Sequence, residues 1–221
     1  MVNVVIACGF QAEADRAPQG VTIVISGGDP AKLAAGLDAA LDAGCTHILV
    51  WGTCGALAPD IRAGTLVTGY SFRASADQPD WVFDYTWSER LSTAAGAKFV
   101  VVTAAGGTLI TVDQKTALRA STAADVVDLE VGVAVEVALR RGVPCAYLRA
   151  VSDEADETIP PAARDAITKT GSIDAWLAIS GVAMDVTELP AMIRLGETSA
   201  AAFESLRRAA ASIGTTCGAA S

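Results

Sequence analysis

Short runs of β-branched and apolar residues alternate with helical patterns as far as Val151, and this alternation most constrains the fold. The periodicity predicts strands at residues 2–8, 21–25, 47–51, 65–70, 99–103 and 145–151. Helices are predicted between them, most clearly at 31–43 and 130–141. Strands and helices that alternate with short links favour right-handed crossovers and parallel pairing. We therefore predict an α/β fold in three layers, with a central mixed, mostly parallel twisted sheet flanked by helices.

The chain contains no linker, composition break or internal repeat that would divide its 221 residues. We predict one domain over residues 1–211. Four further helices, at 162–169, 173–184, 189–195 and 200–211, are expected to pack on the sheet. Residues 212–221 are mostly Gly, Ala, Ser and Thr without periodicity, which predicts a flexible tail.

The composition excludes several classes of function. The net charge of -9 and the absence of a basic run argue against a nucleic-acid partner. Five cysteines without a CxxC spacing fit a reducing cytoplasm, and no segment reaches the roughly 18 apolar residues that a membrane span needs. His47 is the single histidine and no cluster has ligand spacing, so we predict no metal and no cofactor. We expect a cytoplasmic protein.

Polar residues that follow predicted strands are candidate site residues, because ligands gather at the carboxyl ends of strands in open α/β sheets. Small residues follow the third strand at 52–57, where Thr53 offers a hydroxyl, although a tight turn needs the same residues. Asp128 and Glu130 end a strand-like run. A carboxylate there can accept hydrogen bonds from two vicinal ribose hydroxyls, or it can stabilise the start of a helix.

A third polar group, formed by Arg149, Ser152 and Asp153, ends the last predicted strand. An acid that is partly desolvated there has a raised pKa and can donate a proton. Alternatively, Ser152 or Asp153 caps a following helix. The sequence pattern leaves both interpretations open.

Taken in order, these segments resemble the nucleoside phosphorylase and nucleosidase superfamily. The resemblance runs to about Ile159 and is carried by residues 52–59, 64–67, 128–130 and 149–153. A closer similarity is to the hopanoid-biosynthesis-associated nucleoside phosphorylases, and it is carried by Lys115, Leu118, residues 159–163 and a late helix at 189–190. Those enzymes act on adenosylhopane. The resemblance thus implies a phosphorylase-type fold and the release of adenine from an adenosine-containing, possibly lipid-linked, small-molecule substrate.

The resemblance also implies a role for individual residues. Asp153 matches the acid that protonates purine N7, and Ser152 orients it. Glu130 and Leu129 match the ribose-binding residues, with Leu129 where nucleosidases usually carry Met. Glu13 falls where nucleosidases place the carboxylate that activates water, although a solvated acid in a first helical turn is the alternative. The remaining implied contacts are Leu109, Ile110 and Asp128 on the purine, and Thr53, Arg149 and Gly9 on phosphate or the nucleophile.

The residues leave two nucleophiles open, inorganic phosphate and water. Thr53 matches a hydroxyl that bacterial phosphorylases use on phosphate, but Val50 stands where they carry an arginine. Arg149, Arg73 and Lys115 are candidate cations for a phosphate dianion. We rank phosphorolysis of adenosylhopane first, with inorganic phosphate as co-substrate. Hydrolysis of methylthioadenosine or S-adenosylhomocysteine is the second hypothesis, and a nucleoside-binding protein without activity is the third.

Four aromatic residues, Trp81, Phe83, Tyr85 and Trp87, alternate with other residues, which predicts one aromatic face on an extended segment. Such a face suits the apolar tail of a lipid-linked substrate, a half-buried strand or a subunit interface. The family resemblance implies a homodimer or a higher homo-oligomer.

Overall fold

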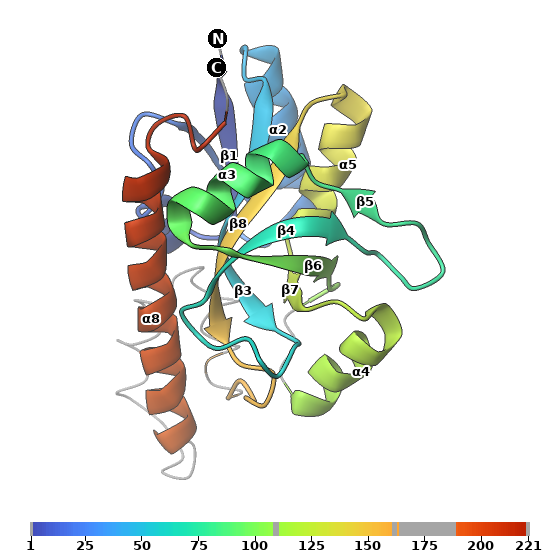
Figure 1. Ribbon diagram of the computed structural model, residues 1–221, viewed down its shortest axis with the longest axis vertical. Helices are drawn as coiled ribbons and strands as arrows, with labels where there is room; N and C mark the ends of the chain where they lie inside the picture. The colour runs from blue at the N-terminus through green and yellow to red at the C-terminus, as the bar shows by residue number, and fades with distance from the viewer. Residues whose placement is uncertain (1, 108–110, 161–162, 164–188, 220–221) are drawn as a thin grey trace.

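A computed structural model describes residues 2–107, 111–160, 163 and 189–219 of the chain (Figure 1). Its centre is a mixed sheet of eight strands. The strands are β1 (Val4–Cys8), β2 (Thr22–Ile25), β3 (His47–Ala56), β4 (Leu66–Phe72), β5 (Trp81–Val82), β6 (Lys98–Ala104), β7 (Val126–Asp128) and β8 (Cys145–Asp153). The helices are α1 (Gln11–Ala14), α2 (Pro30–Asp42), α3 (Tyr85–Ala95), α4 (Val112–Thr122), α5 (Val131–Arg141) and α8 (Leu189–Ile213). The predicted α/β fold is confirmed.

The strand pairings close part of this sheet into a ring. β3 pairs with β8 in parallel, β8 with β4 antiparallel, and β4 with β6 in parallel. β6 then pairs in parallel with β7, and β7 returns antiparallel to β3. β1 and β2 extend the sheet in parallel from the other edge of β3. Because β1, β3 and β8 run in parallel, their carboxyl ends meet at one end of the sheet.

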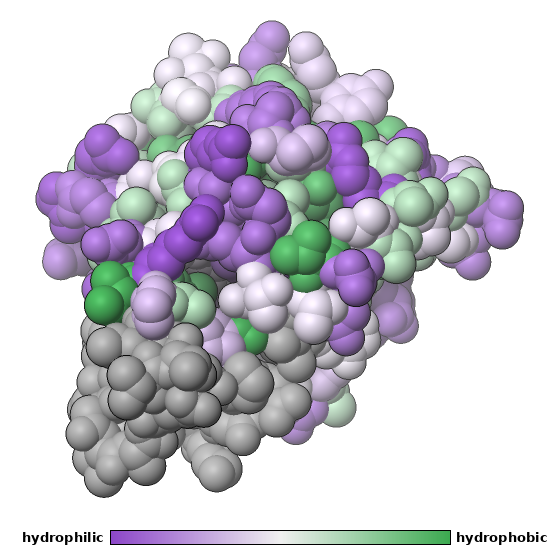
Figure 2. Space-filling view, turned by 90° about the horizontal axis from the view of Figure 1, so that it is seen from below, coloured by the Kyte–Doolittle hydropathy of each residue, from purple (hydrophilic) through white to green (hydrophobic). Residues whose placement is uncertain are grey.

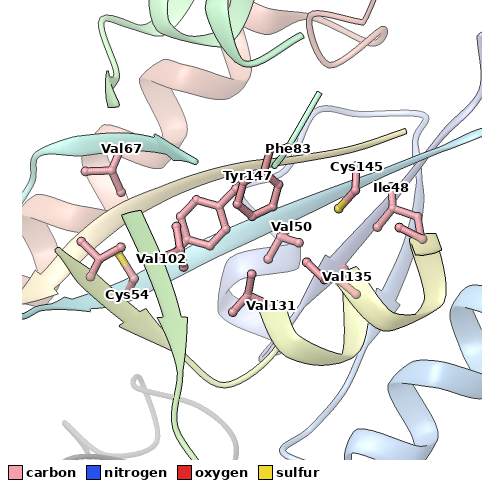
Figure 3. Close-up of a cluster of buried hydrophobic side chains, with 14 of the residues drawn as sticks. Ile48, Val50, Cys54, Val67, Phe83, Val102, Val131, Val135, Cys145 and Tyr147 are labelled. Atoms are coloured by element: carbon pink, nitrogen blue, oxygen red, sulfur yellow. The ribbon is translucent and has the colours of Figure 1, made fainter. Parts of the chain in front are cut away.

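Helices cover both faces of the sheet, as the alternation of side chains along its central strands requires (Figure 1). Val50 of β3 points toward α2 and α5, where it packs with Leu37, Val131 and Val135 in one buried cluster (Figure 3). Its neighbours on the strand, Leu49 and Trp51, face the other way. They belong to a second cluster with residues of α3 and α8. The three layers are therefore helices, sheet and helices.

The prediction of one extended aromatic face at residues 81–87 is wrong. Only Trp81 and Val82 form a strand, and Asp84 begins helix α3 by accepting a hydrogen bond from the Trp87 backbone N–H at 2.9 Å. Phe83 is buried and Tyr85 is 54% exposed, so the aromatic side chains point in different directions. The cause is the Asp84 cap, which changes the periodicity from 2 to 3.6 within the run.

Helix α8 replaces the two shorter helices expected at 189–195 and 200–211. It is continuous because the intervening residues include no proline, and its buried face, with Ala202 and Leu206, packs against the sheet. The expected frayed tail is packed as far as Ala219, since Cys217 is buried and its carbonyl accepts a hydrogen bond from Trp87 Nε1 at 2.8 Å. The helices predicted at 162–169 and 173–184 lie outside the described residues, apart from Ala163.

Hydrophilic residues cover much of the described surface in the view from below, with small hydrophobic areas between them (Figure 2). Among the described residues, no helix is both long enough and apolar enough to cross a membrane.

Candidate functional site

A pocket of about 140 Å³ opens where the carboxyl ends of β1, β3, β7 and β8 come together. Strands β3 and β8 extend further than predicted, so Thr53 and Asp153 lie within strands and not in loops after them. The lining residues are Phe10, Glu13, Thr53, Cys54, Gly55, Ala105, Gly107, Lys115, Val127, Asp128, Leu129, Glu130, Arg149, Ser152, Asp153, Ile159, Leu195 and Ser199. The pocket therefore collects acidic side chains from three separate parts of the chain, at Glu13, at Asp128 with Glu130, and at Asp153.

Glu13 of α1 is 2% exposed and its carboxylate is held by four donors. Oε2 accepts the backbone N–H groups of Gly9 at 2.8 Å and Phe10 at 3.2 Å. Oε1 accepts both the backbone N–H and the hydroxyl of Thr53, at 2.7 and 2.9 Å. The groups that the family resemblance assigned to an anion or nucleophile, Gly9 and Thr53, are thus bound to this carboxylate.

Glycines make room for the carboxylates of the pocket. At Gly52, whose φ is +134°, an added Cβ would lie 2.4 to 2.6 Å from the carboxylate atoms of Glu13. At Gly9 it would lie 3.0 Å from Glu130 Oε1, and at Gly55 it would lie 3.0 Å from Asp153 Oδ2. The small residues after the predicted third strand therefore serve the close approach of carboxylates to the backbone, and not a tight turn.

Arg149 of β8 is the cation around which three of these acids gather, and it is 1% exposed. Its Nε lies 2.9 Å from Asp128 Oδ2, its Nη2 donates to Glu130 Oε2 at 3.0 Å, and its Nη1 lies 3.9 Å from Glu13 Oε1. Nη1 also donates to the Thr53 carbonyl at 2.6 Å. These contacts commit most of the guanidinium to the protein's own carboxylates and to the Thr53 carbonyl.

Burial dominates the acid–base properties of this cluster. Burial raises the pKa of Glu13, against the opposing attraction of Arg149, while Glu130 adds to the increase. The pKa of Asp128 is raised to about 6, again mainly by burial, and Arg149 opposes the shift. Two nearby carboxylates that share one cation cannot both ionise as easily as they would in water. A carboxylate with a raised pKa is a better acceptor for a proton at neutral pH.

Asp128 and Glu130 differ in how far they reach into the pocket. Asp128 Oδ1 accepts the backbone N–H groups of Glu130 and Val131, at 2.9 and 2.7 Å, and so caps the start of α5. Its Oδ2 lies 2.9 Å from Arg149 Nε but accepts no hydrogen bond from the described residues, and the purine contact that the resemblance implied stays a prediction. Glu130 Oε1 accepts a hydrogen bond from the Ser26 hydroxyl at 3.1 Å. Ser26 is a site residue that the sequence analysis missed, because it follows the short strand β2 without a motif.

Asp153, at the end of β8, has a different partner. Its Oδ1 accepts the Ser152 hydroxyl at 2.9 Å, as the resemblance implied. Its Oδ2 accepts from Lys115 Nζ of α4 at 2.6 Å, and the same ammonium donates to the Glu154 carbonyl at 2.6 Å. Lys115 is 1% exposed. The lysine that was a candidate ligand for phosphate is therefore paired with the candidate acid.

One other candidate cation, Arg73, does not reach this site. Arg73 lies outside the pocket, where Nε contacts Asp80 at 2.7 Å and Nη1 donates to the Thr122 carbonyl at 2.9 Å. Leu109 and Ile110, the expected purine contacts, lie outside the described residues. Leu129 lines the pocket beside Glu130, and its contact with the sugar stays a prediction.

Metal and thiol chemistry find little support in the described part of the chain. Those residues contain no group of three or more His, Cys, Asp or Glu side chains placed to hold a metal ion. Cys54 lines the pocket, but burial raises the pKa of its thiol far above neutrality, so no reactive thiolate forms there. The chemistry of the pocket therefore rests on carboxylates, one arginine and one lysine.

Comparisons with known proteins identify the family of the chain and agree with its fold. A family model described as the phosphorylase superfamily matches residues 8–175. The fold is similar to futalosine hydrolase of Helicobacter pylori, with a TM-score of 0.65 and 15% identity over 94% of this chain and 97% of that one. It is also similar to the 5′-methylthioadenosine/S-adenosylhomocysteine nucleosidase of S. pneumoniae, with a TM-score of 0.69 and 14% identity over 99% of both chains. A comparison with curated protein sequences gives no match.

Proposed function

Because the chain belongs to the phosphorylase superfamily, we propose that it hydrolyses the N-glycosidic bond of a purine nucleoside, with water and not phosphate as the acceptor. The observation that carries this proposal is the environment of Glu13. Its carboxylate occupies the backbone amides of Gly9 and Thr53 and the Thr53 hydroxyl, which would otherwise be the donors for a phosphate. Phosphate would meet a second anion there.

Glu13 is the proposed general base. A water molecule within reach of its carboxylate loses a proton to it as the water oxygen bonds to C1′ of the ribose. The raised pKa of Glu13 favours this transfer near neutral pH, and the four donors that hold its oxygens fix its orientation. Asp153 is the proposed acid that delivers a proton to N7 of the departing base, and Glu130 the acceptor for the ribose hydroxyls.

The charge around Arg149 supports a cationic transition state. N-glycosides of purines break through a ribosyl group with oxocarbenium character, and fixed negative groups stabilise the charge that develops on it. Arg149 contacts three carboxylates, those of Asp128, Glu130 and Glu13, so negative groups outnumber the cation. The same excess disfavours the binding of a phosphate dianion.

The 5′ substituent is proposed to be apolar. Phe10, Leu129, Ile159 and Leu195 line the pocket together with the acids, and they offer contacts to a hydrocarbon or thioether group. The resemblance to hopanoid-associated enzymes makes adenosylhopane the first candidate substrate, and methylthioadenosine is the second. The similar structures from H. pylori and S. pneumoniae are named as a hydrolase and a nucleosidase, which fits water as the acceptor.

The test is the release of adenine from adenosylhopane and from methylthioadenosine, each with and without added inorganic phosphate. We expect release without phosphate from at least one of them, a free ribose hydroxyl at C1′ in the product, and turnover that is lower by about 100-fold in Asp153→Asn. Release that depends on phosphate and yields a ribose 1-phosphate would overturn the hydrolytic proposal. Binding of both nucleosides without any release would point to a nucleoside-binding protein on the same fold.

A further inference from the structure

The Lys115–Asp153 pair is an unusual feature of the pocket, because an acid that must give a proton to the base is bound to a cation. The Asp153 carboxylate accepts hydrogen bonds on both oxygens, from Lys115 Nζ at 2.6 Å and from the Ser152 hydroxyl at 2.9 Å. Two accepted hydrogen bonds, one of them from an ammonium, are the contacts of an ionised carboxylate. In this arrangement Lys115 is the hydrogen-bond donor of the pair and Asp153 the acceptor.

We propose that Lys115 is a positioning residue that holds the proton for N7 and passes it through Asp153, an inference that rests on the proposed function. As the C1′–N9 bond breaks, its electron pair moves onto the purine. N7 takes a proton from Asp153, and Asp153 takes one from the Lys115 ammonium, which becomes a neutral amine. On the sugar, water bonds to C1′ and gives its proton to Glu13. After the products leave, proton exchange with water in the open pocket restores Glu13 and Lys115, so the net reaction is nucleoside plus water to sugar plus purine.

The surroundings of Lys115 suit such a role. Its side chain is 2% exposed, so bulk water does not readily exchange with the Nζ–Oδ2 contact. Helix α4 begins after Thr111, one turn before Lys115. The side chains of Thr111 and Gln114 each accept a hydrogen bond from the other residue's backbone N–H, and this capping box fixes the start of the helix. The Glu154 carbonyl accepts a second hydrogen from Nζ at 2.6 Å, which keeps the ammonium on Asp153 while the proton is shared.

The charged groups that surround the Lys115–Asp153 pair are held in ion pairs of their own. A change in the pH profile of activity in a Lys115 variant can therefore be attributed to this pair. The Glu154 carboxylate is bound to Arg62 at 2.7 Å, and Arg194 of α8 contacts Glu154 and Glu157. From the other side of the pocket come Glu13, Asp128, Glu130 and Arg149, which form their own cluster. Within the described residues, Lys115 is the cation in hydrogen-bond contact with Asp153.

Two substrates with different leaving groups distinguish a proton-transfer role of Lys115 from a structural role. Methylthioadenosine loses a purine that needs a proton at N7, whereas 4-nitrophenyl β-D-riboside loses a phenolate that needs none. We expect Lys115→Met to lower kcat on methylthioadenosine about 100-fold or more, the usual range for loss of general-acid assistance, and to change its pH profile. On the riboside the same variant should stay within about threefold of the wild type. Lys115→Arg keeps the charge and should restore part of the lost turnover.

The matched control is Lys98→Met, which removes another Lys–Asp pair, since Lys98 Nζ lies 2.7 Å from Asp60 at the surface. It should leave both substrates unaffected. If Lys115→Met does not fold, Lys115→Met/Asp153→Asn removes both charges together, and we expect its turnover of methylthioadenosine to equal that of Asp153→Asn alone. A lower rate in the double variant would show that Lys115 does not act through Asp153.

The outcomes distinguish the inference from the proposed function on which it rests. Loss of methylthioadenosine cleavage in Glu13→Gln and Asp153→Asn, together with full activity in Lys115→Met, would overturn the role of Lys115 and leave the hydrolytic function intact. Equal losses on both substrates in Lys115→Met would also overturn it, because a structural role affects both leaving groups. Retained activity in Asp153→Asn would contradict the proposed function itself.

Discussion

The two ends of the pocket handle charge in opposite ways. Around Arg149, three carboxylates share one buried guanidinium, at distances of 2.9, 3.0 and 3.9 Å. Around Asp153, one carboxylate is matched by one buried ammonium at 2.6 Å. The first end holds an excess of negative charge, and the second is a neutral pair. An excess of carboxylates suits a site that stabilises a cation, whereas a neutral pair suits a site that stores a proton.

The largest effect is expected from replacing Glu13, the proposed general base, which lies at the Arg149 end of the pocket. Glu13→Gln keeps the shape of the side chain but cannot accept a proton from water, so kcat should fall by about 100-fold to 10,000-fold. Steady-state kinetics on methylthioadenosine would measure this. The exposed Glu89→Gln is the matched control and should be neutral. Unchanged turnover in Glu13→Gln would remove the base from the mechanism.

A methyl group at Gly52 tests whether the carboxylate of Glu13 must lie against the backbone. Gly52→Ala places Cβ 2.4 to 2.6 Å from that carboxylate at a φ of +134°, so the base must move and the backbone is strained. We expect a loss of turnover of about tenfold or more and a loss of roughly 1–3 kcal/mol in the free energy of unfolding.

Gly142→Ala serves as the control for Gly52→Ala, because its φ is +63° and no atom lies within 4 Å of the added Cβ. It should lose about 1 kcal/mol of stability and keep full turnover. Equal kinetics for the two variants would show that the clash with Glu13 is unimportant.

The crowding of carboxylates around Arg149 should also appear in the pH dependence of stability. The pKa of Asp128 is raised from 3.8 to about 6, so the folded protein binds this proton more tightly than the unfolded chain does. The contribution of Asp128 to the free energy of unfolding therefore increases as the pH falls from about 6 to about 4, and is lost as the pH rises through 6.

Urea unfolding at a series of pH values would measure this contribution. In Asp128→Asn the increase between pH 6 and pH 4 should shrink relative to the wild type. Parallel curves for the two proteins would contradict the raised pKa.

The smallest effect is expected at Arg73, which lies outside both ends of the pocket. Its partner Asp80 is 25% exposed on the side chain and Arg73 itself is 27% exposed, so the pair is screened by water. Arg73→Gln should change the free energy of unfolding by about 0–1 kcal/mol and leave the kinetics unchanged. A strong loss of turnover would contradict this prediction and would support Arg73 as a ligand for an anion.

How much of the site the sequence predicted depends on whether partners lie close along the chain. Asp153 with Ser152, and Glu130 with Leu129, are neighbours in sequence, and their placement in one pocket was expected from the strand ends. The partners of Arg149 were not, since Glu13 lies more than a hundred positions before Asp128 and Glu130 in the sequence. The aromatic run at 81–87 shows a different limit, because one aspartate cap converted an apparent strand into a helix start.

By itself, the sequence determined the α/β alternation, six of the eight strands of the sheet and the identity of the acids at strand ends, because periodicity and strand ends are local properties of the chain. Only the tertiary structure decided which charged side chains pair with each other. It placed the Glu13 carboxylate on the donors that a phosphate would need, and it paired Lys115 with Asp153 across 38 positions of sequence. Charge pairing in a buried pocket depends on distances between strands and helices, and closure of the β3, β8, β4, β6 and β7 ring sets those distances.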